Sequence, residues 1–141
     1  MELEFRQCKE NDITALVLLS KSTFTKAFEK DNDPDDFENY IKIAFSRDTL
    51  LKQLRNQNSF FYFVYFNELL LGYLKLNQYQ AQTELRTDDS MELERIYILE
   101  EFQGQGYGTL ALQKLKDIGL QRNKRFIWLG VWEKNVNAMK E

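Results

Sequence analysis

Residues 93–109, Leu-Glu-Arg-Ile-Tyr-Ile-Leu-Glu-Glu-Phe-Gln-Gly-Gln-Gly-Tyr-Gly-Thr, join a strand pattern to a helical pattern through a glycine-rich turn. We predict the strand over 91–98, the helix over 106–122 and a further strand over 125–131. A connection that runs from strand to helix to strand is right-handed and makes its two strands parallel. This stretch therefore predicts an α/β protein whose sheet contains a parallel pair of strands.

A β-hairpin is predicted on the N-terminal side of this unit. Two segments rich in aromatic and branched residues, 59–66 and 69–77, flank the dipeptide Asn67-Glu68, and the polar segment 80–90 is expected to be a loop. The alternation over 2–7 predicts one more short strand. Together these segments predict a mixed, mostly antiparallel central sheet (an α+β arrangement) with helices on both faces.

Helices are predicted between the first strand and the hairpin. Asp33 and Pro34 fit the N-cap and the first position of one helix, and Ser46 fits the N-cap of the next. The buried faces of the predicted helices follow from helical spacing. They comprise Ile13, Leu16, Val17, Ser20, Phe24 and Phe28; Phe37, Tyr40, Ile41 and Ala44; Leu50, Leu51 and Leu54; and Leu110, Leu112, Leu115 and Ile118.

The composition of the chain excludes several classes of protein. With 141 residues, 43% of them hydrophobic, it can close one core, so one domain is expected. Its 19 basic and 22 acidic residues give a net charge of -3, which argues against nucleic-acid binding. The chain has no histidine, which rules out histidine acid–base chemistry, and no pattern predicts a metal site. No apolar run approaches the length of about 20 residues that spans a bilayer, so we expect no membrane segment and a cytoplasmic protein.

Three alternate glycines, Gly104, Gly106 and Gly108, stand at the start of the helix predicted over 106–122. Glycine lets the backbone adopt positive φ and approach a ligand closely, while the first N–H groups of a helix and its dipole favour an anion. A pyrophosphate fits such a turn. The dinucleotide-binding pattern G-x-G-x-x-G fails because Thr109 occupies its third glycine position, and no P-loop lysine follows. The alternative is a tight turn whose glycines only cap and pack.

The segment Gln103-x-x-Gly106-x-Gly108, placed after the strand 93–98, resembles the acyl-CoA signature Q/R-x-x-G-x-G/A of the GNAT superfamily of N-acetyltransferases. The block 127–135 followed by Ala138, and the hairpin strands, are similar to the PaiA type of bacterial spermidine N-acetyltransferases. The resemblance implies the GNAT acyl-CoA N-acyltransferase fold and acetyl-CoA, released as coenzyme A, as cosubstrate. It also implies an amine acceptor, with a polyamine such as spermidine or spermine as the preferred candidate.

The same resemblance implies a cofactor site between two parallel strands that splay apart. A bulge in the first of these strands would direct an amide N–H at the thioester carbonyl, where it would stabilise the developing oxyanion. The pantetheine arm would pair with the strand, the pyrophosphate would lie in the glycine turn, and an asparagine beyond the second strand would contact the cofactor. The residues concerned are, in that order, Ile96, Tyr97 and Ile98; Gln103, Gly104, Gln105, Gly106, Tyr107, Gly108 and Thr109; and Asn135.

Glu92 and Glu94 are the candidate catalytic residues. An acceptor amine arrives as an ammonium, with a reference pKa of about 10, and must lose a proton before it attacks. The two carboxylates lie two residues apart on a strand and so are expected on one face. By resemblance, Glu94 matches the position associated with polyamine acetylation and Glu92 the base of related protein acetyltransferases; we prefer Glu94. The alternative is that both are solvent-side residues of a half-exposed strand.

An acidic segment near the predicted helix start at Asp33 could attract a polycation, although such a run also suits a solvated helix start. Aromatic side chains could line the acceptor groove, although helical spacing favours core packing for most of them. The acidic residues are Asp31, Asp33, Asp35, Asp36 and Glu38, and the aromatic residues are Phe24, Phe28, Tyr40 and Phe45.

Two other interpretations of the function remain: acetylation of another small amine or a protein amino group, and a non-catalytic acyl-CoA-binding regulatory module.

The C-terminal end departs from the pattern that the resemblance implies. The family carries a tyrosine that protonates the leaving thiolate, and two last strands, at positions that would follow Glu141. We therefore expect residues 1–141 to form a single GNAT domain that lacks its C-terminal strands. Because an uncovered sheet edge can pair with another chain, the sequence also predicts a possible homodimer.

Overall fold

The computed structural model describes residues 3–129, which form two compact units. The sheet unit consists of residues 3–7 together with 58–129, and the helical unit consists of residues 8–57. Within the described residues, no helix is long and apolar enough to cross a membrane. The predicted C-terminal strand continued to residue 131, and its end lies outside the described residues.

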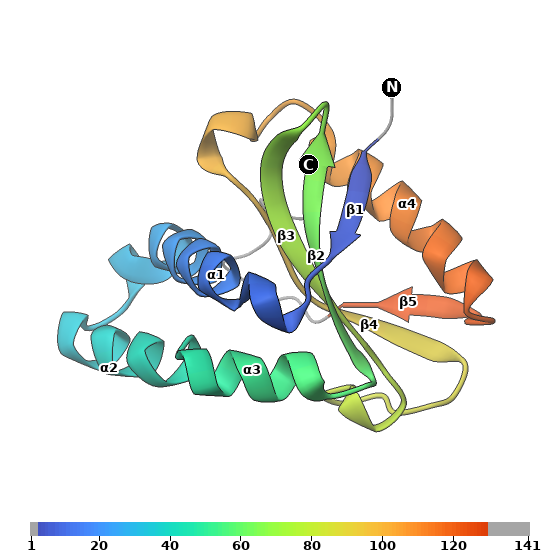
Figure 1. Ribbon diagram of the computed structural model, residues 1–141, viewed down its shortest axis with the longest axis horizontal. Helices are drawn as coiled ribbons and strands as arrows, with labels where there is room; N and C mark the ends of the chain where they lie inside the picture. The colour runs from blue at the N-terminus through green and yellow to red at the C-terminus, as the bar shows by residue number, and fades with distance from the viewer. Residues whose placement is uncertain (1–2, 130–141) are drawn as a thin grey trace. The chain divides into compact units, whose positions relative to one another are not determined.

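The sheet unit contains five strands that follow one another across the sheet in chain order (Figure 1). All neighbouring pairs are antiparallel except the last, which is parallel, so the predicted mixed sheet is confirmed. The hairpin turn is also confirmed, since Asn67 and Glu68 have φ of 49° and 67°, as the favoured two-residue turn requires. The strands are β1 (Glu4–Gln7), β2 (Ser59–Phe66), β3 (Leu69–Gln78), β4 (Ser90–Ile98) and β5 (Phe126–Trp128).

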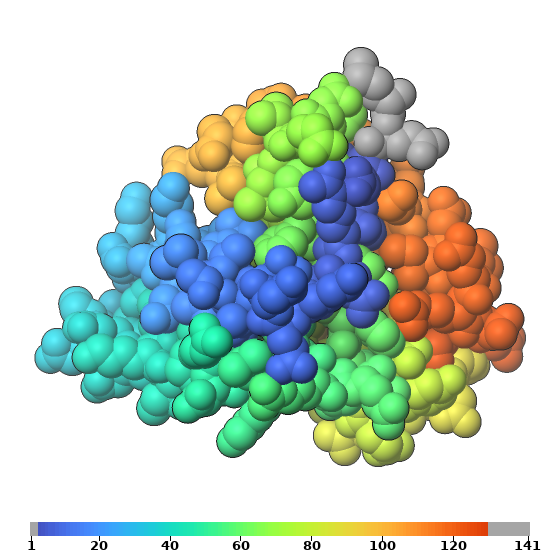
Figure 2. All heavy atoms as spheres, viewed as in Figure 1, coloured from blue at the N-terminus to red at the C-terminus, as the bar shows by residue number. Residues whose placement is uncertain are grey.

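Helix α4 (Tyr107–Gln121) connects β4 to β5 and packs on one face of the sheet. Its buried side chains Ala111 and Leu115 join an apolar core with residues of β2, β3 and β4. The prediction that Leu110 faces inward is wrong, because 44% of its surface is exposed. Residues 111, 115 and 118 share the inner stripe of the helix, which turns position 110 outward. The outer side of α4, in orange and red, lies at the surface in Figure 2.

A β-bulge interrupts the pairing of β3 with β4. Lys75 lies opposite Arg95, whereas the next residue, Leu76, lies opposite Leu93, so Glu94 is an additional residue in β4. The predicted bulge in this strand is therefore present. Because of it, Leu93 and Ile96 both face the apolar core beneath α4, although they are three residues apart.

The helical unit contains three α-helices, and its predicted caps are confirmed. The carboxylate of Asp33 accepts a hydrogen bond from the Asp36 amide at 3.1 Å, and the Ser46 hydroxyl accepts one from the Thr49 amide at 3.2 Å. Of the stripe predicted for the second helix only Phe37 is buried, and Tyr40 is 54% exposed. The elements are η1 (Glu10–Asp12), α1 (Ile13–Phe28), η2 (Glu29–Asp31), α2 (Pro34–Ala44) and α3 (Arg47–Arg55).

Aromatic rings hold the helical unit together around Phe24. The Phe24 ring lies 4.6 Å from the ring of Phe28 and 5.0 Å from that of Phe45, measured between centroids. It also contacts Phe37 at 5.8 Å and Tyr40 at 5.6 Å. Such pairs add about 0.5–1.5 kcal/mol beyond burial. Most of the aromatic residues that the sequence offered for an acceptor groove thus pack against one another within this unit.

Candidate active site

The glycine turn lies between η4 (Glu100–Phe102) and α4. Gly104 and Gly106 have φ of +76° and +84°, a conformation that favours glycine, and Gly106 is the N-cap of α4 without any side-chain cap. A Cβ built on either glycine would meet no atom within 4 Å. Since the first N–H groups of a helix have no partner within the helix, the turn presents donors beside open space. This geometry suits an anion.

Gln103 has a different part in the turn from the one expected. Its amide donates to the Glu100 carbonyl at 3.2 Å, and its side chain donates to the Ile98 carbonyl at 2.8 Å. It therefore ties the turn to the end of β4, and in this structure its own N–H is not presented to a ligand. Donors suited to an anion begin after Gln103, at Gly104.

Aromatic contacts fix the first turn of α4 on the sheet. The Tyr107 ring lies 5.5 Å from that of Phe66 on β2 and 6.5 Å from that of Phe102. These contacts hold the helix start in place, where Gly108 is buried while Gly104 and Gly106 remain exposed. The turn is thus rigidly attached on one side and open on the other.

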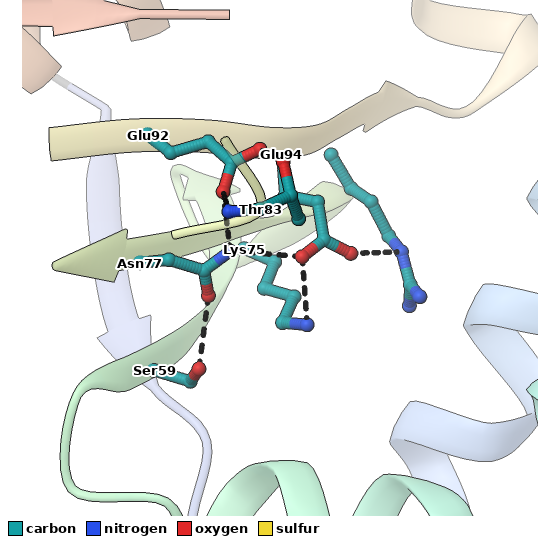
Figure 3. Close-up of polar contacts among 7 residues, drawn as sticks. Ser59, Lys75, Asn77, Thr83, Glu92 and Glu94 are labelled. Atoms are coloured by element: carbon teal, nitrogen blue, oxygen red, sulfur yellow. Dashed lines mark hydrogen bonds and ion pairs between the residues drawn. The ribbon is translucent and has the colours of Figure 1, made fainter. Parts of the chain in front are cut away.

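Glu92 and Glu94 lie on the same face of β4, opposite the face that α4 covers (Figure 3). The side-chain amide of Asn77 donates to Oε1 of Glu92 at 2.9 Å and to Oε1 of Glu94 at 2.8 Å. Its carbonyl accepts from the Ser59 hydroxyl at 2.9 Å. The prediction that the two carboxylates share a face is confirmed, and Asn77, which is fully buried, joins them.

Glu92 is saturated with hydrogen bonds. Besides the bond from Asn77, its carboxylate accepts from the Thr83 amide at 2.9 Å and from the Thr83 hydroxyl at 2.5 Å. Only 3% of the residue is exposed, so the alternative of a solvent-side residue is wrong for Glu92. These bonds hold the β3–β4 connection against the sheet, which gives Glu92 a structural role.

Glu94 is held differently, by cations and with more access to solvent. Its Oε1 accepts from Lys75 Nζ at 3.0 Å, its Oε2 lies 3.4 Å from Arg95 Nε, and 22% of its side chain is exposed. Burial by itself raises the pKa of Glu94, but the charges of Lys75 and Arg95 and the bond from Asn77 outweigh it and lower the pKa. Burial also lowers the pKa of Lys75, against the attraction of Glu94. Glu94 is therefore an anion at neutral pH.

A second polar cluster joins the β3–β4 connection to β5. The side chain of Gln82, which is 1% exposed, accepts hydrogen bonds from the Ser90 hydroxyl and the Trp128 indole, both at 2.8 Å. Its amide donates to the carbonyls of Tyr79 at 3.2 Å and Thr87 at 3.1 Å. Buried polar groups are stable when satisfied in this way. Gln82 thus joins the start of β4 to the last residue of β5.

All three residues of β5 pair with the beginning of β4. The pairs run from Ser90 with Phe126 to Glu92 with Trp128. The expected cofactor-binding residues Ile96, Tyr97 and Ile98 lie beyond the last of these pairs. Tyr97 stacks on Tyr73 of β3, with ring centroids 5.7 Å apart.

Two groups of residues predicted for the site cannot be placed beside Glu92, Glu94 and the glycine turn. Asn135 lies outside the described residues. The acidic run from Asp31 to Glu38 belongs to the helical unit, where it is exposed around the start of α2.

Sequence reasoning missed Lys75, Asn77 and Thr83. A signal for the first two was present, because Lys75 and Asn77 are polar positions that alternate within an otherwise apolar strand. Alternation predicts which residues share a face, but the partner across the sheet depends on register. Thr83 gave no signal, since it lies in a polar connection among many similar residues.

Comparison with known families identifies the fold. The model of the acetyltransferase (GNAT) family matches residues 14–140. The chain belongs to this family. As a GNAT protein it is an N-acetyltransferase, its acetyl donor is acetyl-CoA, and its acceptors are amines. The predicted fold class is confirmed.

Individual relatives support the same assignment. The GNAT chain is 36% identical over 132 residues to an uncharacterised N-acetyltransferase from the pepI 3' region of Lactobacillus delbrueckii subsp. lactis, covering 94% of this chain and 76% of the relative. The fold is similar to that of the PaiA N-acetyltransferase from Thermoplasma acidophilum in complex with coenzyme A. That similarity has a TM-score of 0.76 at 18% identity and covers 96% and 83% of the two chains. An aminoglycoside acetyltransferase from an uncultured soil metagenomic sample, in complex with sisomicin, is similar with a TM-score of 0.69 at 15% identity, covering 98% and 83%.

Proposed function

We propose that this GNAT protein acetylates a primary amine of a polyamine such as spermidine or spermine, and that Glu94 accepts the proton of the attacking amine. The observation that carries the assignment of the base is the difference between the two carboxylates. Glu92 accepts three hydrogen bonds and is 3% exposed, whereas Glu94 keeps 22% of its side chain in contact with solvent. A group that takes up a proton must be within reach of the amine.

The reaction proceeds by direct attack. The ammonium of the acceptor first gives a proton to Glu94, directly or through water. The neutral amine nitrogen then forms a bond to the thioester carbonyl carbon, the carbon–sulfur bond breaks, and coenzyme A leaves as a thiolate that takes up the second proton released by the nitrogen. Because the pKa of Glu94 is lowered, the carboxylate is unprotonated at neutral pH and passes the proton on to solvent instead of retaining it.

The cofactor would lie across the end of β4 and the start of α4. The family resemblance implies that residues Gln103 to Thr109 hold the diphosphate and that the backbone of Ile96 to Ile98 pairs with the pantetheine arm. The N–H donors would begin at Gly104, because the N–H of Gln103 donates to the Glu100 carbonyl. The bulge at Glu94 supports a further element, an amide N–H directed at the thioester oxygen. Asn135 would contact the cofactor from beyond β5.

The polyamine is proposed on three grounds: the sequence resemblance, the similarity to a PaiA fold, and the acidic residues around the start of α2. A polycation is attracted by such a run. Another small amine, such as an aminoglycoside, is the second candidate because a similar fold belongs to an aminoglycoside acetyltransferase. A protein amino group is the third.

The test is a turnover assay of the purified chain with acetyl-CoA and a panel of spermidine, spermine, an aminoglycoside and a peptide amine. We expect the highest kcat/KM with a polyamine. Glu94→Gln should lower kcat by about 100-fold or more while coenzyme A still binds, since general-base catalysis contributes about 10²–10⁴. The matched control Glu84→Gln removes an exposed carboxylate from the β3–β4 connection and should retain turnover. A Glu94→Gln variant as active as the control would refute the base, and no turnover of polyamines would refute the acceptor.

We also propose that residues 1–141 act as one GNAT domain in the cytoplasm and that the chain forms a homodimer. The support for the homodimer is that β5 is the outermost strand on its side of the described sheet, and an uncovered strand pairs readily with another. Sedimentation as a monomer at high concentration would refute the homodimer.

A further inference from the structure

The carboxylates beside the bulge are neutralised by cations of the protein itself. Glu92 and Glu94 supply two negative charges, and Lys75 and Arg95 supply two positive charges in the same buried cluster (Figure 3). Lys75 is the least exposed of the ion-paired side chains, at 7%, and its Nζ also lies 5.5 Å from the centre of the Phe61 ring. The cluster therefore offers an incoming cation little net negative charge.

Lys75 and a protonated acceptor amine present the same chemical group to Glu94. The Lys75 ammonium lies 3.0 Å from Oε1, the same oxygen that Asn77 contacts at 2.8 Å. Arg95 lies 3.4 Å from the other oxygen. An ammonium that approaches Glu94 therefore meets a carboxylate that is already engaged on both oxygens. It must displace Lys75 or bind beside a like charge, which is unfavourable in a partly buried site.

We propose that Lys75 is a specificity-determining residue, whose ammonium occupies the Glu94 oxygen that a protonated amine would otherwise bind and so weakens the binding of polycationic acceptors. This inference rests on the proposed role of Glu94. Lys75 acts as a built-in competitor: its charge opposes each additional charge on the acceptor, while a singly charged amine is penalised less.

The test compares Lys75→Met with the matched control Lys75→Arg, in the full chain loaded with coenzyme A. Methionine keeps an unbranched side chain of similar length without the charge, and arginine keeps the charge. Calorimetry measures the Kd of spermidine and of a monoamine, n-butylamine, in each variant. We expect Lys75→Met to bind spermidine about three- to tenfold more tightly, with a smaller gain for the monoamine. Removing the Lys75 charge removes its repulsion of the cationic acceptor, and solvent screening limits the resulting change in Kd to about tenfold. Lys75→Arg should bind spermidine no more tightly than the unaltered chain.

A double variant separates this inference from the proposed reaction. In the Glu94→Gln background, Lys75→Met should leave the Kd of spermidine within about twofold, because no carboxylate remains for the two cations to contest. Two results together would support the inference and refute Glu94 as the base. They are tighter spermidine binding in Lys75→Met and unchanged turnover in Glu94→Gln. A Kd unchanged or raised by Lys75→Met, or no measurable spermidine binding to either protein, overturns the inference. If Lys75→Met fails to fold, Lys75→Gln, which keeps a polar head, takes its place in the same comparison.

Discussion

Substitutions at Gly106 can distinguish two effects on coenzyme A binding: repulsion of the diphosphate by an added charge, and the strain of placing a side chain at positive φ. The φ of Gly106 is +84°, and a Cβ there would meet no atom within 4 Å. Any other residue thus incurs the cost of a left-handed conformation, about 1–2 kcal/mol, but no steric clash. Gly106→Ala measures this cost alone, Gly106→Gln adds a longer neutral side chain, and Gly106→Glu adds a negative charge to the same length.

The expected effect of the charge follows from Coulomb's law. A carboxylate about 4 Å from a phosphate costs about 4 kcal/mol at an effective dielectric constant of 20. The turn is exposed, so solvent and salt reduce this to about 1.5–2 kcal/mol. Gly106→Glu should therefore bind coenzyme A about tenfold or more weakly than Gly106→Gln, since each 1.4 kcal/mol is a factor of ten.

The assay is a calorimetric titration of each variant with coenzyme A, beside a thermal unfolding curve. All three variants should unfold at similar temperatures, because they share the same backbone strain. The difference in Kd between the glutamate and glutamine variants should shrink as salt rises, since it is electrostatic. Equal affinity of these two variants for coenzyme A would show that the diphosphate does not lie at Gly106, and the cofactor placement would have to be abandoned.

Two further predictions concern the buried cluster. Asn77→Leu removes two hydrogen bonds to carboxylates and one from Ser59, so denaturant unfolding should show a loss of about 3 kcal/mol, against about 1 kcal/mol for Ser59→Ala; equal losses would contradict the bridging role of Asn77. The pKa of Glu94 is lowered from its ordinary value of 4.5, so its ionisation stabilises the folded state above pH 4.5 and this stability is lost as pH falls through the lowered pKa. As the pH is lowered from 6 into the acid range, the free energy of unfolding should fall less steeply in Glu94→Gln than in the unaltered chain. The same dependence on pH in both proteins would contradict the ion pairs of Glu94 with Lys75 and Arg95.

Local signals predicted much of the fold because they act over a few residues. Asp33 and Ser46 cap their helices as expected, and the dipeptide Asn67-Glu68 forms the hairpin turn. The parallel pair of strands followed from the order of elements alone. Helical spacing is less decisive where two neighbouring residues could each begin the buried stripe. In α4 spacing alone did not determine that Ala111 faces inward and Leu110 outward.

The candidate site was predictable only in part, because it depends on contacts between distant residues. The glycine turn and both glutamates were found in the sequence. That Asn77 lies opposite Glu92, and that Lys75 reaches Glu94, depends on the register of β3 against β4. The difference between a saturated Glu92 and a cation-bound Glu94 comes from Thr83 and Arg95, whose contacts no local pattern specifies.

The additional residue in β4 is not needed for the pairing of the sheet. Side chains before and after Glu94 alternate out of step, which is how Glu92 and Tyr97, five residues apart, come to lie on one face. A strand without Glu94 would place Leu93 directly before Arg95, opposite Leu76 and Lys75 as they are now, so Leu93 and Ile96 would both stay in the apolar core. What the bulge adds to β4 is one carboxylate and one backbone amide outside the regular ladder. A shortened strand would therefore keep its packing and lose only these two groups.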